Sequence, residues 1–280
     1  MIRDSKTVRI IRVTLVSLIA LVLIYPLVWM VISSFKPEDM IFKDLSLIPS
    51  QVTLENYAIG WLSTGRVTFS TYFYNSIRIS VLAVIGNIIS CSLVAYSFAR
   101  LEYRGRKLFF SLMLMTMMLP VHATIVPQFA YFFKMGWVDT ILPIVLPKFL
   151  ATDAFFIFLI VQFYRGIPRD LDEAAIVDGC NRYSVFYRIL LPLAAPALIT
   201  TTIFTFMWTW NDFFTQIIYL RTPTSYTATL GLRMFIDRQA ISQYGAMFAM
   251  STLSIVPILV LFVAFQRLLI EGVATTGIKG

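Results

Sequence analysis

Long apolar stretches separated by short charged segments dominate the pattern of this chain. A helix needs about 20 apolar residues to cross the roughly 30 Å hydrocarbon core of a membrane. Six stretches are long enough, so the sequence predicts an all-α polytopic membrane protein with six transmembrane helices. The stretches are residues 13–34, 79–99, 108–133, 140–164, 189–210 and 246–266.

The fourth stretch is the least regular of the six, because Lys148 and Asp153 lie within it. Thr152 or Asp153 can cap a helix N-terminus, so we expect the continuous helix to start there, with Lys148 at the outer membrane interface. In the third stretch, Pro120 and Pro127 predict a kink, since proline removes a backbone hydrogen bond.

The first stretch resembles a signal peptide, because basic residues precede it. However, residues 13–35 contain no charge, and those 23 residues exceed a signal h-region. No small-residue cleavage site follows. The sequence therefore predicts a retained first span.

Composition and charge agree with a membrane chain. Of the 280 residues, 58% are hydrophobic and 14% are charged, whereas soluble domains carry about 25% charged residues. The net charge of +8 could indicate nucleic-acid binding, but a basic excess in a membrane chain more often sets topology. We therefore expect membrane lipid and no nucleic acid among the partners.

The distribution of basic residues predicts the orientation of the spans. With six spans and the N-terminus inside, both termini are cytoplasmic, and fourteen of the 23 Lys and Arg residues lie on the inner side, as the positive-inside rule requires. These fourteen are Arg3, Lys6, Arg9, Arg12, Arg100, Arg104, Arg106, Lys107, Arg165, Arg169, Arg182, Arg188, Arg267 and Lys279.

A polar loop, residues 165–192, interrupts the apolar pattern on the inner side. Asp170 with Glu173 three residues later has the spacing of a capping box, and two helical turns are expected to follow. Gly179 allows a sharp turn. A second short helix is expected over residues 184–190, and Pro192 then opens the fifth span. Such a helix suits docking into a groove of another protein; the alternative is a capped helix lying on the membrane.

The residues of this loop also carry a family resemblance. Glu173-Ala174-Ala175, Gly179 after three further residues, and Ile189-x-Leu191-Pro192 after nine more resemble the EAA loop of bacterial ABC-importer permeases. Trp210-Asn211-Asp212-Phe213 is similar to the Trp-Asn-x-Phe stretch of sugar permeases. The resemblance is to the MalG-like carbohydrate permeases.

This resemblance implies the type I ABC importer permease fold and a place in the bacterial cytoplasmic membrane. Residues 1–70 would hold the N-terminal tail, first span and first outer loop. Residues 71–267 would be the ABC transmembrane type-1 core with its coupling loop 165–192, and residues 268–280 a cytoplasmic tail. The residues that map onto the ATPase-docking loop are Glu173, Ala174, Ala175, Asp178, Gly179, Ile189, Leu191 and Pro192.

The resemblance further implies a passive permease that imports a sugar or oligosaccharide. Its partners would be a second permease that completes the pore, a cytoplasmic ATPase dimer and an extracytoplasmic sugar-binding protein. The chain has no Gly-x-x-x-x-Gly-Lys-Ser/Thr sequence, so it lacks a phosphate-cradling loop of that kind. We therefore expect no cofactor in this chain, with ATP and Mg bound by the partner.

Polar residues at membrane depth are candidates for the translocation path, since they tend to face the bundle interior or a water-filled cavity. Each has an alternative: His122 could simply bond a neighbouring helix, and the tryptophans could form an interfacial aromatic belt. The candidates are Asn87, His122, Gln128, Trp208, Asn211 and Asp212.

Two other functions compete with the permease hypothesis. A membrane-embedded enzyme needs clustered acid, base or metal ligands, and one histidine with scattered carboxylates argues against catalytic residues or a metal site. An ion-coupled carrier or channel acting without an ATPase could use Asp153 and Asp212. Transport by the chain alone would distinguish that alternative.

Overall fold

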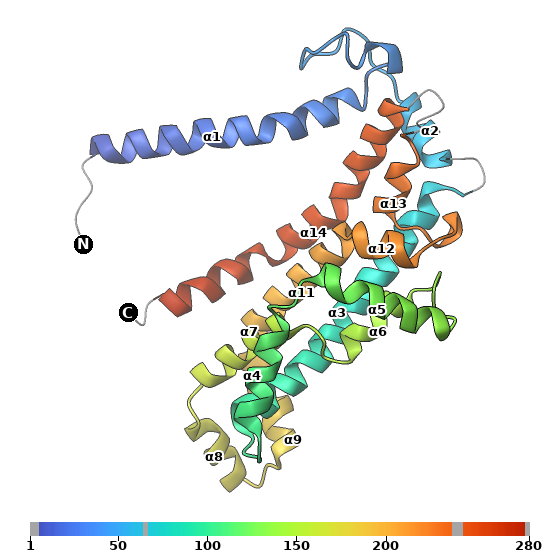
Figure 1. The fold of residues 1–280 in the computed structure, drawn as a ribbon. Coiled ribbons are helices and arrows are strands. Elements are labelled where there is room, and N and C mark those ends of the chain that lie inside the picture. The colour runs from blue at the N-terminus through green and yellow to red at the C-terminus, as the bar shows by residue number, and fades with distance from the viewer. Residues whose placement is uncertain (1–5, 64–66, 237–242, 278–280) are drawn as a thin grey trace. The chain divides into compact units, whose positions relative to one another are not determined.

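Helices are the only regular elements in the part of the chain that the computed structural model describes, residues 6–63, 67–236 and 243–277 (Figure 1). The all-helical prediction is confirmed over these ranges. Arg3 and residues 278–280 of the expected 268–280 tail lie outside them, as do the side chains from residue 267 onward. The elements in chain order are α1 (Lys6–Ser33), η1 (Glu38–Met40), α2 (Glu55–Leu62), α3 (Phe69–Arg100), α4 (Arg106–Thr116), α5 (Val121–Lys134), α6 (Leu142–Phe149), α7 (Ala154–Gly166), α8 (Asp170–Val177), α9 (Arg182–Val185), η2 (Phe186–Leu190), α10 (Leu191–Leu193), α11 (Ala195–Asn211), α12 (Phe214–Tyr219), η3 (Pro223–Ser225), α13 (Ala228–Arg233) and α14 (Tyr244–Gly277).

Four helical segments of the described residues are long and apolar enough to cross a membrane: α1, α3, residues 142–166 and residues 244–266. Two bent helix pairs would raise the number to six if each pair formed one span. In the first pair α4 and α5 meet at 99°, and in the second residues 182–193 and α11 meet at 73°.

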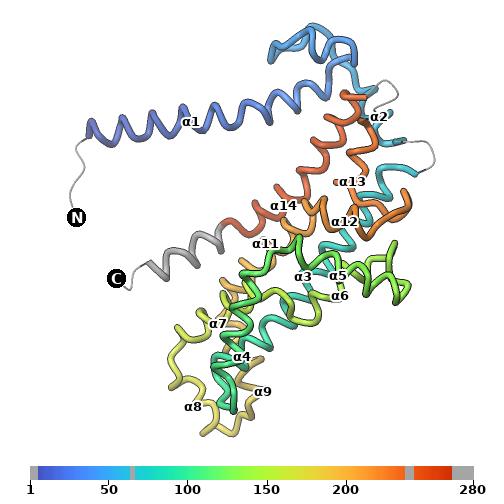
Figure 2. Tube along the Cα trace, viewed as in Figure 1, coloured from blue at the N-terminus to red at the C-terminus, as the bar shows by residue number. Residues whose placement is uncertain are grey.

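The third stretch is therefore not the single kinked helix that the sequence predicts. Figure 2 shows the chain turning between α4 and α5. The backbone N–H groups of Met117, Met118 and Leu119 bond to carbonyls three residues back, which tightens the end of α4. Pro120 then donates no hydrogen bond and disfavours helix at Leu119, so helical structure does not continue beyond the turn after α4. Pro127, in contrast, stays inside α5.

The fifth stretch also differs from its prediction. Helix begins earlier, at Arg182, and passes through a π-helical turn, η2, and the short α10. The chain then bends at Ala194, and the long helix α11 starts at Ala195, not at Pro192. Proline in the first turn of both α10 and α11 explains the break, because neither ring nitrogen can donate to the preceding turn. The predicted end near Trp210 is confirmed, since α11 ends at Asn211.

The fourth stretch contains two helices, α6 and α7, joined at residues 150–153. Asp153 occupies the N-cap position of α7, as predicted, but its side chain forms no cap hydrogen bond. The carboxylate bonds to other side chains instead, which matters for the cavity described below.

The described chain divides into two compact units, residues 1–70 with 231–256 and residues 71–230 with 257–280. In the first unit, the segment after α1 holds the start of α14. The Glu38 carboxylate accepts hydrogen bonds from the N–H groups of Tyr244 and Gly245, each at 2.7 Å. An anionic side chain at a helix N-terminus is favourable, because it satisfies free N–H groups and complements the helix dipole.

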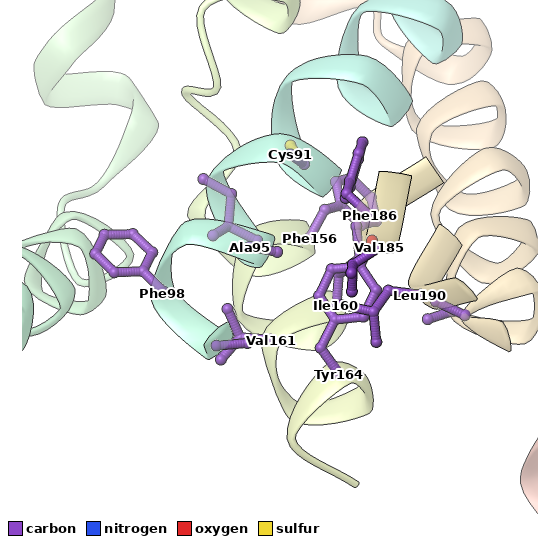
Figure 3. Close-up of a cluster of buried hydrophobic side chains, with 14 of the residues drawn as sticks. Cys91, Ala95, Phe98, Phe156, Ile160, Val161, Tyr164, Val185, Phe186 and Leu190 are labelled. Atoms are coloured by element: carbon purple, nitrogen blue, oxygen red, sulfur yellow. The ribbon is translucent and has the colours of Figure 1, made fainter. Parts of the chain in front are cut away.

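The second unit has a hydrophobic core built from α3, α7 and the loop after α8. Figure 3 shows buried side chains of these elements converging, among them Ala95 from α3, Ile160 from α7 and Leu190 from η2. Each of these three side chains is inaccessible to solvent. The loop of residues 165–192 is thus packed onto the helices and not simply tethered to them.

Candidate functional site

Helix α8 forms the first part of the loop that the sequence singles out. The capping box predicted from Asp170 and Glu173 is wrong. The cap position is Arg169, which has helical backbone angles, and no side chain caps the helix. The Arg169 carbonyl already accepts the N–H groups of Asp172 and Glu173, so Asp170 lies within the first turn, where its charge still complements the helix dipole.

Two side chains at the end of α3 fix this loop. The Tyr96 hydroxyl donates to the Arg182 carbonyl at 3.0 Å, at the start of α9. The Arg100 guanidinium donates from Nη2 to the Ile167 carbonyl at 2.9 Å, and its Nε lies 2.9 Å from Asp172 Oδ2. The start of the loop, α8 and the start of α9 are therefore held by one helix.

The pair of Arg100 and Asp172 is mostly removed from solvent, with side chains 5% and 16% exposed. Burial raises the pKa of the Asp172 carboxyl, and the nearby Arg100 and Arg169 charges only partly oppose it. Among the described residues, Asp172 Oδ1 and Arg100 Nε have no hydrogen-bond partner. The contact at Nε is thus an ion pair without a formed hydrogen bond.

Helix α8 has one buried position and a broad exposed face. Ala175 is 7% exposed and belongs to the core, which explains why a small residue stands there. Glu173, Ala174 and Asp178 are exposed, and Val177 is 87% exposed. Ile176 beside it is 54% exposed, and adjoining apolar side chains left uncovered are typical of a surface that another molecule covers.

The turn after α8 depends on Gly179, as the sequence predicts. Its φ is +86°, a conformation that side-chain-bearing residues rarely adopt. A Cβ added there would meet no atom within 4 Å, so the requirement is for backbone conformation and not for space. Asn181 then caps α9 by accepting the Ser184 N–H at 2.8 Å.

A second feature is a cavity of about 700 Å³ within the second unit. Its lining combines amide, carboxylate, hydroxyl and ammonium groups with one partly exposed indole. Volumes of this size hold small organic ligands. The lining residues that carry polar or aromatic chemistry are Thr116, Thr124, Gln128, Lys148, Thr152, Asp153, Trp208, Thr209, Asn211, Asp212, Thr215 and Tyr219.

A partly buried network supports the cavity from α3. Lys148 Nζ lies 2.8 Å from Asp153 Oδ2, and Asn87 Nδ2 donates to the same oxygen at 2.6 Å. Asn87 Nδ2 also reaches Thr205 Oγ1 on α11 at 3.0 Å. Ser90, one turn along α3, donates to the Lys148 carbonyl at 2.6 Å. Together these bonds join α3, α6, the start of α7 and α11 at one point.

Comparison with known proteins identifies what kind of chain carries these two features. Residues 91–275 match the model of the family described as the binding-protein-dependent transport system inner membrane component. The chain belongs to this family.

Individual relatives of the permease match over nearly its whole length. It is 33% identical over 265 residues to the arabinooligosaccharides transport system permease protein AraQ of Halalkalibacterium halodurans, covering 94% of this chain and 93% of that protein. It is 30% identical to the trehalose/maltose transport system permease protein MalG of Thermococcus litoralis, covering 99% of each.

A solved structure has the same fold. A chain of a bacterial ABC transporter involved in the import of the acidic polysaccharide alginate superposes with a TM-score of 0.83, at 22% identity, over 95% of the permease and 99% of that chain. The arrangement of helices described above is therefore that of an ABC importer permease.

The permease does not bring all the predicted path residues together. Gln128, Trp208, Asn211 and Asp212 line the cavity, but His122 does not. The His122 ring instead packs edge-on against Phe214, with ring centroids 4.6 Å apart. The sequence alternative, a histidine in contact with a neighbouring helix, describes this position better, although the contact is a ring contact.

Asn87, Trp208 and Trp210 also differ in how they relate to the cavity. Asn87 is fully buried and does not line the cavity, but it donates a hydrogen bond to Asp153, which does. Trp208 is 52% exposed and contacts the rings of Phe155, Phe156 and Phe204. Trp210 is 2% exposed and stacks on Phe206. Trp210 is therefore a core residue of the permease and not part of an aromatic belt.

Several residues of these features are absent from the sequence-based set. Lys148 was expected at the outer interface, but it pairs with Asp153 and lines the cavity. The sequence could have indicated this pair, because Lys148 and Asp153 are opposite charges within one apolar stretch. Ionisable groups at membrane depth usually pair. Nothing in the sequence marks Tyr96 and Arg100 as the residues that hold the loop.

Proposed function

We propose that this chain is a transmembrane permease subunit of a binding-protein-dependent ABC importer for a sugar or oligosaccharide. In this proposal it has six spans with both termini in the cytoplasm of a bacterial cell, and the bent pairs α4–α5 and α9–α11 each contribute one span. It forms half of a pore with a second, related permease. A cytoplasmic ATPase dimer binds ATP and Mg, and an extracytoplasmic binding protein delivers the substrate.

The observation that carries the proposal is the outward face of α8. Glu173, Ala174 and Val177 lie at i, i+1 and i+4, so Glu173 and Val177 are neighbours on the helix surface. The face offers an apolar centre with a carboxylate beside it, while Ala175 anchors the opposite side. A short helix presented in this way fits a groove on an ATPase subunit.

In this proposal α3 transmits motion from the loop to the cavity. Arg100 and Tyr96 contact the loop at one end of the helix, and Asn87 and Ser90 bond the cavity wall further along. Thirteen residues separate Asn87 from Arg100, which is about 20 Å along a helix axis. A docked ATPase that displaces α8 would therefore displace the point where α3, α6 and α11 meet. Only states that differ in these contacts can couple ATP use to transport.

The cavity chemistry favours a hydroxylated substrate. Asp153, Asp212 and Asn211 offer acceptors and donors, and Trp208 offers a flat apolar surface. Tyr219 lines the cavity, and its buried hydroxyl has no partner among the described residues. Buried hydroxyls nearly always bond to something, so this group is available to a sugar hydroxyl or a water. The names of the relatives, which include arabinooligosaccharides and trehalose/maltose, support the same class.

The test is ATP-dependent sugar uptake by the assembled transporter carrying Glu173→Lys. We expect uptake to be abolished while membrane insertion stays normal, because the reversed charge lies on the docking face. The matched control is Glu102→Lys, an exposed acid on the preceding inner loop, whose contact with Arg169 is 3.8 Å and solvent-exposed and therefore weak. Normal uptake by Glu173→Lys at normal expression would overturn the docking role. Transport by the permease alone, without ATPase or second permease, would favour an ion-coupled carrier or channel instead.

A further inference from the structure

A second cavity, of about 380 Å³, lies at the loop end of α3 and is lined by four arginines: Arg100, Arg106, Arg165 and Arg169. They come from α3, from the start of α4, from the end of α7 and from the residue that precedes α8. This cavity is distinct from the docking face of α8 and from the proposed translocation cavity. Among the lining residues no carboxylate appears.

The positive charge of this arginine cavity is only partly balanced. Arg100 pairs with Asp172, and Arg169 has a distant, exposed contact with Glu102. Within the described residues, neither Arg106 nor Arg165 has an ion-pair partner.

Arg106 and Arg165 are nevertheless held in place. Arg106 Nη1 donates to the Leu101 carbonyl at 2.9 Å. The Arg165 guanidinium lies over the Phe110 ring, 5.0 Å from its centroid. Both contacts orient the side chain and leave other N–H donors free, which is the arrangement that binds phosphate oxygens well.

Apolar surface adjoins the arginines directly. Helix α4 begins at Arg106, and its next turns expose Leu108, Phe109 and Leu112, each about half accessible or more. A ligand with a negative head at Arg106 would thus have a hydrocarbon surface beside it for a tail. A free phosphate or a nucleotide would leave that surface uncovered.

We propose that this arginine cavity binds the headgroup of an anionic phospholipid, with its acyl chains along α4. The proposal rests on the membrane-spanning orientation of the proposed function, which puts the cavity at the cytoplasmic surface, where basic pockets between helices bind anionic headgroups. It does not require the ATPase, the sugar or the docking of α8.

The test is native mass spectrometry of the detergent-purified permease with dioleoyl phosphatidylglycerol and dioleoyl phosphatidylcholine in competition. The wild type should retain the anionic phosphatidylglycerol preferentially. Arg106→Gln with Arg165→Gln should reduce that preference about 30-fold at low salt, since each basic residue near a membrane surface contributes about a fivefold factor. Arg106→Lys with Arg165→Lys keeps the charge and should retain most of the preference, which guards against misfolding as the cause.

Arg104→Gln is the matched control, because Arg104 is an exposed arginine of the same loop that does not line the cavity. It should keep the preference of the wild type. An unchanged preference in the double Gln variant, or an equal loss in Arg104→Gln, would overturn the proposal. Displacement of the lipid by inorganic phosphate alone at millimolar concentration would also overturn it in favour of a free-phosphate site. Each outcome is read without transport, so failure here leaves the α8 docking test intact.

Discussion

The guanidinium of Arg100 and the carboxylate of Asp172, 72 positions apart in the chain, meet at 2.9 Å. Arg100 is the last residue of α3, and Asp172 lies in the first turn of α8. The pair connects the longest helix of the second unit to the short helix of the loop of residues 165–192. If α8 docks an ATPase, this contact is one route by which motion of the loop reaches the helices.

Replacing Arg100 should therefore damage both stability and coupling. Arg100→Met leaves the Asp172 carboxylate buried without its partner, and breaking such a pair typically destabilises by about 3 kcal/mol. We expect a clear fall in the melting temperature of the purified permease and a larger fall in ATP-driven uptake. Arg104→Met, an exposed position nearby, should change neither. A wild-type melting temperature and uptake for Arg100→Met would show that the pair carries no mechanical role.

Ala174 and Ala175 should respond oppositely to enlargement, because one is exposed and the other is buried. Ala175→Leu inserts three carbons into the core beside Val185 and Phe186, and overpacking of this kind costs about 1–3 kcal/mol. Ala174→Leu should leave thermal stability unchanged and weaken binding of the ATPase subunit. Thermal unfolding and co-purification of the ATPase measure the two effects. Equal destabilisation by both variants would contradict the assignment of the two faces.

The Lys148–Asp153 pair should be more sensitive to single than to double substitution. Lys148→Met alone leaves the Asp153 carboxylate without its partner in a partly buried site, and Asp153→Asn alone leaves the Lys148 ammonium without its partner. The double variant removes both charges. We expect a coupling energy of about 1–3 kcal/mol in a double-mutant cycle of unfolding free energies. Sugar uptake should fall in each single variant and recover in part in the double. Strictly additive effects would mean that the pair does not act as a unit.

The hydrogen bonds of the Asp139 carboxylate predict that stability falls at low pH. Burial opposes its ionisation, but hydrogen bonds from Ser225 and from the backbone N–H groups of Arg221 and Thr222 outweigh burial and lower the pKa to about 2. In an unfolded chain the pKa of an aspartate carboxyl group is about 3.9. Its stabilisation is thus present above pH 4 and is lost as pH falls toward 2.

Asp139→Asn should therefore be less stable than the wild type by about 1 kcal/mol at neutral pH, a figure that allows for partial exposure. The difference in melting temperature between the two proteins should shrink as pH falls from 4 to 2. Asp39→Asn, at an exposed acid with no hydrogen bond or ion pair among the described residues, provides the control. A wild-type-to-variant difference that does not change with pH would contradict the role of the carboxylate charge.

The sequence predicts the all-helical fold and the sharp turn after α8, because both depend on local patterns. The end of α11 and the positive φ of Gly179 follow from residue type and spacing. The bends at Pro120 and Ala194 do not follow in the same way. Pro127 remains within α5 while Pro120 ends α4, so the presence of a proline does not say whether a membrane helix continues, as neighbouring groups can satisfy the freed carbonyls.

Long-range contacts account for most of the remaining differences. Asp153 could either cap α7 or bind Asn87 and Lys148. Which of these happens depends on which helices pack together, and the sequence does not contain that information. The same holds for Ala175, whose neighbour Ala174 has the same side chain and the opposite exposure. Helical spacing would tell the buried alanine from the exposed one only if it were known which face of α8 packs against the core.

Site-specific crosslinking in the assembled importer tests the central claim most directly. A photocrosslinker attached to Val177→Cys is compared with one at Ala175→Cys, in a Cys180→Ser background, because Cys180 is the partly exposed native thiol and Cys91 is buried. We predict adducts with the ATPase subunit from position 177, with a yield that changes between nucleotide states, and few or none from the buried position 175. Adducts from position 177 with lipid alone, in every nucleotide state, would contradict the account.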